Sequence, residues 1–341
     1  MDILGYSALA AVTIIMTLGF DFVNGFHDSA NSIATIIATK VLSPLAAVSM
    51  AAFFNFLGIM LGQEVAKTIG RGIIDTDLLR DCGILLMFCA VTGALIWDLI
   101  TWWWAIPTSS SHALVGGLIG AGVAAAAALD AVVWSGTLKT IAFIVISPAV
   151  GLVAGFALMV VVMRIARRVS KTTVNKWFRK LQILSSASYS LAHGTNDAQK
   201  GMGVIAMVLI IEAGSDPATS VFSVPLWVRL ACVSAIAFGT FFGGWRIVKT
   251  MASRITKLEP YQGFCAETGA AAMLFTTASM GVPVSTTHTI SGSIMGVGAT
   301  KRFSAVRWGV GRRIVIAWVV TIPAAATISG LLFLLLRVLG V

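Results

Sequence analysis

The stretch Asn24-Gly-Phe-His-Asp-Ser-Ala-Asn-Ser32 decides the fold, because the chain contains it twice. Its counterpart in the second half is His193-Gly-Thr-Asn-Asp-Ala-Gln-Lys-Gly201, which also lies in a long apolar segment. Ionisable, glycine-containing motifs at corresponding positions of two apolar halves are typical of secondary transporters and mark their binding sites. The repeat therefore predicts two related halves that together form a transport site.

A second motif is also duplicated. Pro107-Thr-Ser-Ser-Ser-His112 is matched by Pro283-Val-Ser-Thr-Thr-His288, and a glycine-rich helix is expected after each. Hydroxyl groups and free N–H groups at a helix N-terminus form an anion site without arginine. Ordinary N-caps and helix-packing seams explain the same residues, and a cap hydroxyl can also be shared with a substrate. The candidate substrate-binding hydroxyls are Thr108, Ser109, Ser110, Ser111, Ser285, Thr286 and Thr287.

The composition indicates an all-α polytopic membrane protein. Hydrophobic residues make up 57% of the 341 residues and charged residues only 11%, with several apolar runs of membrane-spanning length. The net charge of +10 does not indicate nucleic-acid binding, because the basic residues lie between apolar segments and no folded domain remains to present them. The four cysteines have no metal-ligand spacing, so we expect neither a metal nor a cofactor.

The apolar segments divide the chain into two halves. We expect a first transmembrane repeat at 1–163, a basic cytoplasmic linker at 164–182 and a second transmembrane repeat at 183–341. Each half contains five apolar segments, and an odd number inverts the second repeat relative to the first. The segments are expected at roughly 3–39, 44–62, 82–100, 101–123, 138–163, 183–212, 227–245, 264–282, 283–299 and 314–336.

The loop charges predict the orientation. Residues 63–81 and 124–137 are neutral or acidic, whereas their counterparts 246–259 and 300–313 are rich in lysine and arginine. Basic loops stay in the cytoplasm, so the positive-inside rule places both termini outside a multi-pass protein of the cell (inner) membrane.

Asp28 and Asp197 are acids in the middle of long apolar spans, where an ionised carboxylate costs several kcal/mol. Each lies close to glycine and asparagine, which favours a helix broken at membrane depth. The alternative is a glycine that serves helix packing and an aspartate that caps a half-helix.

Other polar residues are weaker candidates. His112 and His288 occupy the same repeat position, where they either carry protons or hydrogen-bond locally. Glu267 lies at the edge of an apolar helix, and its first-half counterpart is not acidic. Three further residues are expected at helix ends or interfaces: Asp21, Asp98 and Lys67.

With both motifs present twice and in order, the chain resembles the inorganic phosphate transporter (Pit/PiT) family, of the bacterial low-affinity permease type. The resemblance covers nearly the whole chain. It implies an inverted-repeat secondary transporter with two re-entrant helical hairpins that meet near the midplane. In this family, phosphate lies between the hairpin hydroxyls and the signature aspartates, which are Asp28 and Asp197 in this chain. The resemblance also suggests a homodimer.

Two departures from the sodium-coupled pattern bear on the coupling ion. His27 stands where the family often has asparagine, although Asn31 is kept. In the second signature Asn196 is kept, but Lys200 replaces the later asparagine. An ammonium group there repels sodium and neutralises Asp197 or the substrate. We therefore expect proton symport, with the two aspartates and either His27 or His193 as carriers.

Alternative functions remain open at this point. They are a sodium:phosphate symporter or a sulfate permease of the same family, a passive channel, and an intramembrane Ser-His-Asp hydrolase. The hydrolase is disfavoured because a catalytic set needs one asymmetric constellation, and here every candidate has a counterpart in the other half. Free phosphate and a neutral metal–phosphate complex are both candidate substrates. Two acids facing the ligand favour phosphate over sulfate, which has no proton to donate at neutral pH.

Overall fold

The computed structural model describes residues 2–3, 6–60, 62–254 and 257–340, and the described chain is mainly helical. Two two-residue strands, β1 (Asp2–Ile3) and β2 (Tyr6–Ser7), pair in front of the first helix. The helices are α1 (Ala8–Ala38), α2 (Pro44–Leu57), α3 (Glu64–Arg71), α4 (Leu78–Trp103), α5 (Ser110–Ala126), α6 (Trp134–Ala166), α7 (Lys171–Glu212), α8 (Leu226–Phe242), α9 (Trp245–Arg254), α10 (Pro260–Ser279), α11 (Thr286–Ala299) and α12 (Trp308–Val338). Short 3-10 turns lie at Gly58–Met60, Leu129–Ala131 and Phe303–Ala305.

The same order of elements occurs twice. A long helix, α1 or α7, is followed by a bent pair, which is α2–α3 with a 78° bend or α8–α9 with a 70° bend. A hairpin comes next, α4–α5 or α10–α11, and then a long helix, α6 or α12. The short helices α3 and α9 lie in stretches that the sequence indicated only as loops. The all-α transporter fold class is confirmed.

The two repeats exchange partners rather than forming separate bodies. Helix α1 packs against α8, and α7 packs against α2. In the same way, α5 packs against α12 and α11 against α6. Each of the two large hydrophobic clusters contains residues from both halves. Within the expected linker at 164–182, α6 continues to Ala166 and α7 begins at Lys171, so most of that basic stretch is helical.

The helices expected to break at Asp28 and Asp197 do not break. Both α1 and α7 run through their signature motifs, so this part of the expectation is wrong. The neighbouring glycines serve helix packing instead: a Cβ on Gly25 would lie 2.2 Å from the carbonyl oxygen of Ile236 in α8, and one on Gly194 would lie 2.2 Å from that of Asn55 in α2. The backbone breaks lie at the hairpin tips.

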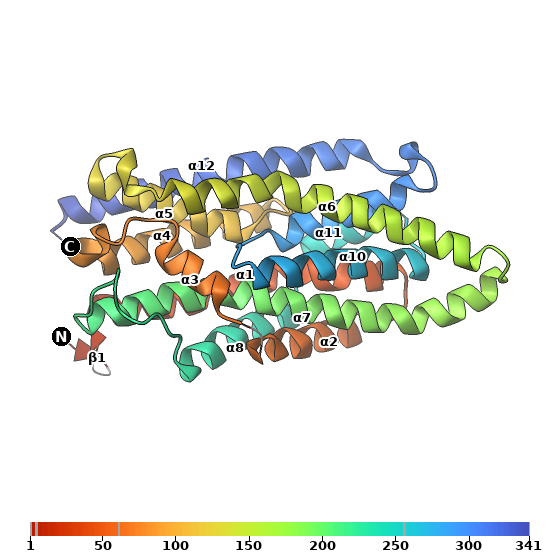
Figure 1. The fold of residues 1–341 in the computed structure, drawn as a ribbon, viewed down its shortest axis with the longest axis horizontal. Helices are drawn as coiled ribbons and strands as arrows, with labels where there is room; N and C mark the ends of the chain where they lie inside the picture. The colour runs from red at the N-terminus through yellow and green to blue at the C-terminus, as the bar shows by residue number, and fades with distance from the viewer. Residues whose placement is uncertain (1, 4–5, 61, 255–256, 341) are drawn as a thin grey trace.

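The hairpins approach the centre from opposite ends. In Figure 1, α4 and α5 lie toward the end that bears both termini, and α10 and α11 lie toward the other end. The turn between α6 and α7 lies at the end away from the termini (Figure 1). Below, the two ends are called the terminus-bearing end and the far end.

Four helices among the described residues have the length and composition to cross a membrane, or up to six if each bent pair is one span. They lie at Ala8–Ala38, Cys82–Trp103, Trp134–Ala166 and Ile314–Val338. Helix α7 is not among them, and its buried face is polar from Gln182 to Lys200.

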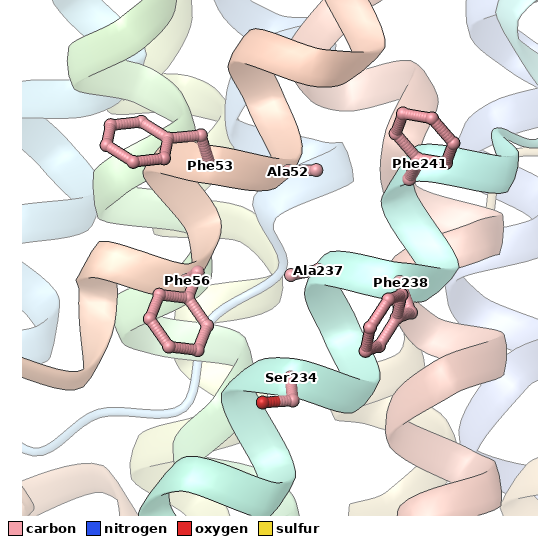
Figure 2. A pocket seen from close by; sticks show the side chains of 7 residues that line it. All are labelled: Ala52, Phe53, Phe56, Ser234, Ala237, Phe238 and Phe241. Carbon is pink, nitrogen blue, oxygen red and sulfur yellow. The ribbon is translucent and has the colours of Figure 1, made fainter.

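An apolar pocket of about 410 Å³ lies between α2 and α8 on the outside of the bundle. Figure 2 shows the phenylalanines of both helices around it. Phe53 and Phe238 are 58% and 64% exposed, as expected for side chains that face lipid. Because the lining is almost entirely apolar, this pocket offers little to a phosphate ion.

Candidate functional site

The tips of the two hairpins meet in the interior of the bundle. Ser109 and Ser285 are the N-caps of α5 and α11, and their hydroxyls accept hydrogen bonds from the backbone N–H groups of His112 (3.3 Å) and His288 (3.1 Å). Ser111 Oγ donates to the carbonyl oxygen of Val284 at 2.9 Å, which joins one tip to the other. Two helix N-termini, each with free N–H groups and a positive dipole end, therefore face the same region.

Asp28 lies at this junction and is 2% exposed. Thr286 Oγ1 and Thr287 Oγ1 of α11 each donate to its carboxylate at 3.3 Å. Ser110 Oγ of α5 is 3.5 Å from Oδ2, and the Nδ1 atom of His27 is 3.0 Å from Oδ1. One signature carboxylate thus contacts hydroxyls from both hairpins.

Two asparagines of α1 hold these hydroxyls in place. Asn31 Nδ2 donates to Thr286 Oγ1 at 3.2 Å and to Thr287 Oγ1 at 2.9 Å. Asn24 Oδ1 accepts from Ser110 Oγ at 2.5 Å. Asn24 was not among the predicted site residues, although its position one helical turn before Asp28 places it on the same face.

Asp197 has a different set of neighbours. Its carboxylate is 3.2 Å from Lys200 Nζ and 3.3 Å from His193 Nε2. Lys200 Nζ also donates to Ser110 Oγ at 2.8 Å, so the second signature reaches the first hairpin. His193 Nδ1 is 3.2 Å from Oδ1 of Asn55, a residue of α2 that the sequence analysis did not single out.

The two signatures form one buried cluster. Donor atoms of Asp28, His193 and Asp197 all lie within 4.8 Å of one another, close enough to hold a cation together. The Lys200 side chain is 1% exposed and brings its ammonium group directly against this cluster. A positive charge is therefore built into the chain beside the two acids.

Other predicted residues lie beside the cluster. Thr108 Oγ1 bonds Thr101 Oγ1 at 2.9 Å and is 3.4 Å from His27 Nε2. Asn196 Nδ2 donates to the carbonyl oxygen of Leu274 at 2.9 Å, which anchors α7 to α10.

The remaining two histidines form a separate pair. The ring centroids of His112 and His288 are 4.8 Å apart, and His288 stacks on Trp318 at 3.9 Å. Their ring nitrogens have no hydrogen-bond partner among the described residues.

Glu267 belongs to another buried cluster. Its carboxylate accepts from Thr35 Oγ1 at 2.5 Å, from Ser185 Oγ at 2.5 Å and from Gln182 Nε2 at 3.1 Å. None of the hairpin-tip hydroxyls is among these partners, so Glu267 is tied to α1 and α7 instead.

Of the three weaker candidates, two are buried where helices pack together, which is one of the two expected locations. Asp21 and Asp98 are wholly buried inside α1 and α4 rather than at helix ends, because those faces of the helices are enclosed by the bundle. Lys67 is exposed on the short helix α3, in a polar pocket of about 380 Å³ that also contains Glu64 and Arg229. The periodicity of the polar residues on α1 was the signal that could have placed Asp21 inside.

Comparison with known proteins agrees with this architecture. The model of the phosphate transporter family matches residues 24–329. A relative from Rhizobium meliloti, named "Probable low-affinity inorganic phosphate transporter", is 52% identical over 323 residues, which cover 94% of each chain. A Bacillus subtilis relative with the same name is 43% identical over 341 residues, 99% of this chain and 100% of that one.

A solved structure, "The sodium-dependent phosphate transporter", superposes with a TM-score of 0.89 at 25% identity, covering 97% of this chain and 100% of that chain. The family consists of transporters and not enzymes, which excludes the hydrolase alternative. Together with the apolar helices, it makes this a multi-pass membrane protein. The chain belongs to the phosphate transporter family.

Proposed function

We propose that this protein imports inorganic phosphate by proton symport with alternating access. The observation that carries the proposal is the cluster at the hairpin tips, where two buried carboxylates and one ammonium group meet two helix N-termini. Hydroxyls from Ser110, Thr286 and Thr287 supply donors to an oxyanion, and the helix N-termini favour negative charge there.

The charges of the cluster support cation coupling. A phosphate ion carries one to two negative charges at neutral pH and would join the carboxylates of Asp28 and Asp197 in a buried region. The ammonium of Lys200 offsets one negative charge only. Because unpaired charge is costly inside the membrane, the loaded site needs further positive charge, and protons on the carboxylates supply it.

Lys200 favours the proton over sodium as the coupling ion. Its ammonium lies 3.2 Å from Asp197, in the position where a coordinated cation would be stabilised. Two unit charges about 4 Å apart repel by about 4 kcal/mol at an effective dielectric constant of about 20. The sodium dependence named for the solved neighbour makes sodium the second candidate ion.

The predicted orientation and assembly belong to the same proposal. The basic segments at 164–182 and 300–313 favour a cytoplasmic far end, with both termini outside the cell membrane. Movement of the hairpins about the cluster would then expose the site to each side in turn. The family resemblance supports a homodimer, which light scattering of the purified protein would test.

The decisive experiment is uptake of labelled phosphate into proteoliposomes. An inward proton gradient and an inward sodium gradient are applied separately, and unlabelled sulfate is added as a competitor. We expect proton-driven uptake that sulfate at equal concentration does not inhibit. Sodium-driven uptake would overturn the choice of ion, strong inhibition by sulfate would overturn the choice of substrate, and uptake that ignores both gradients would indicate a channel.

A further inference from the structure

Helix α1 carries a continuous stripe of polar residues on its buried face. Its members, separated by 4, 4, 3, 4 and 3 residues, are all at most 2% exposed. That spacing keeps side chains on one face of a helix. From the terminus-bearing end inward, they are Thr13, Thr17, Asp21, Asn24, Asp28 and Asn31.

Helix α7 carries the equivalent stripe at the same spacing and with the same burial. Its members are Gln182, Ser186, Ser190, His193, Asp197 and Lys200. Because the repeat is inverted, this stripe runs from the site toward the far end, where α7 begins (Figure 1). Each stripe thus forms a polar half-path, which runs from one end of the bundle to the signature aspartate of its own helix. The two half-paths meet at the central site.

Among the differences between the two half-paths, one concerns an acid. Asp21 of α1 is matched by Ser190 of α7, so only the α1 stripe carries an acid in addition to its signature aspartate. The duplicated fold does not require a carboxylate there, because a hydroxyl occupies the equivalent position. Asp21 lies seven residues before Asp28, which is about 10 Å along a helix.

The surroundings of Asp21 do not satisfy an ionised carboxylate. Asp21 is 0% exposed, and neither of its oxygens has a hydrogen-bond partner of normal geometry among the described residues. It lies tightly against the backbone of α7, where a Cβ on Gly201 would be 2.1 Å from Oδ2. A wholly buried carboxylate is retained at a cost, which is typical of a functional group in a membrane span.

The titratable groups near Asp21 connect it to the site. They are Lys200 and Asp197 of α7 and Cys232 of α8, and the Gly201 backbone lies directly against the Asp21 carboxylate. Lys200 is the residue that also contacts Asp197 and Ser110. A change in the charge of Asp21 therefore changes the electrostatic energy of the Lys200 ammonium group, which links the two signature motifs.

We propose that Asp21 is a proton-carrying carboxyl group on the half-path between the terminus-bearing end and the central site. Its carboxylate takes up one proton from that side and becomes a neutral acid, and it then passes this proton inward to Asp197 of the central site, which restores the Asp21 carboxylate for the next cycle. The polar stripe provides the route, and Thr13 and Thr17 lie between Asp21 and the helix end. This inference rests on the proposed proton coupling.

The test separates proton movement from substrate binding. Asp21→Asn is reconstituted in proteoliposomes and compared with the wild-type protein in two assays: proton-driven net phosphate uptake, and exchange of internal for external phosphate at equal pH. Exchange needs binding and conformational change but no net proton transfer. We expect the variant to lose net uptake and keep exchange, while Asp130→Asn, the same change at an exposed aspartate outside both stripes, keeps both.

Each outcome decides whether Asp21 carries a proton. Normal proton-driven uptake by Asp21→Asn would overturn the inference and leave the proposed function intact. Absence of proton-driven uptake in the wild-type protein would instead overturn the proposed function. If Asp21→Asn loses exchange as well, Asp21→Ser, which installs the hydroxyl found at position 190, is measured next. Retained exchange without net uptake then supports the proposal, and loss of both makes Asp21 a packing residue.

Discussion

Asp28 and Asp197 occupy equivalent positions of the two repeats, but their surroundings differ. Asp28 is surrounded by hydroxyls and one histidine, whereas Asp197 faces an ammonium group and another histidine. The duplication fixes where the two carboxylates lie, and the side chains around them decide their charge and role. Symmetry of the fold therefore does not imply symmetry of chemistry.

The largest expected effect comes from removing either carboxylate. Asp28→Asn and Asp197→Asn should each reduce proton-driven phosphate uptake to the level of empty liposomes. They should differ in stability, because Asp197→Asn leaves Lys200 unpaired and an unpaired buried charge costs about 3–5 kcal/mol. Thermal unfolding in detergent checks this difference. Equal unfolding temperatures for the two variants would contradict the unequal environments.

The next effect tests the ammonium group itself. Lys200→Asn restores the residue type that the sodium-coupled pattern has at this position. It removes a repulsion on the order of 1–4 kcal/mol at about 4 Å, equivalent to about 5-fold to about 1000-fold in sodium affinity. We expect sodium-stimulated uptake to appear while proton-driven uptake falls. No response to sodium would mean that Lys200 does not set the coupling ion.

A smaller effect, a loss of stability that is equal in the two repeats, is expected when either packing glycine is replaced. Gly25→Ala and Gly194→Ala each place a methyl group 2.2 Å from a backbone oxygen, which should cost about 1–3 kcal/mol of stability. Gly19→Ala is the matched control on α1, because nothing lies within 4 Å of its added Cβ. Thermal unfolding of the three variants is the measurement. A control as unstable as Gly25→Ala would argue against close packing as the cause.

The smallest effect is expected in the loop after α7. Hydrogen bonds from the Ala218 N–H, the Thr219 hydroxyl and Arg80 hold the pKa of Asp216 below its usual value. A lowered folded-state pKa contributes stability above the unfolded pKa, and this contribution is lost as the pH falls through the folded pKa. Asp216→Asn should lower the unfolding temperature slightly at pH 7. Below the lowered pKa of Asp216 the difference should disappear, and a difference that persists there would contradict this electrostatic origin.

The sequence alone determined the class of the molecule and predicted many of the residues that lie at its centre. Hydropathy fixes a helical membrane protein, because every backbone group in lipid must be bonded internally. The duplicated motifs predicted two pairs of related segments, and the structure brings Asp28 into contact with Ser110, Thr286 and Thr287. A duplication can be recognised from the sequence alone, because it consists of the same residue types in the same order.

Only the tertiary structure decided how these parts are joined. Gly25 looked like a helix breaker, but the close approach of Ile236 makes it a packing residue in a continuous helix. Glu267 resembled a site residue until its three partners placed it in another cluster. The exchange of partners between repeats, the contact of Lys200 with Ser110 and the burial of Asp21 all depend on which helix faces which. These contacts arise from packing between segments that are far apart in the chain, so local residue patterns do not predict them.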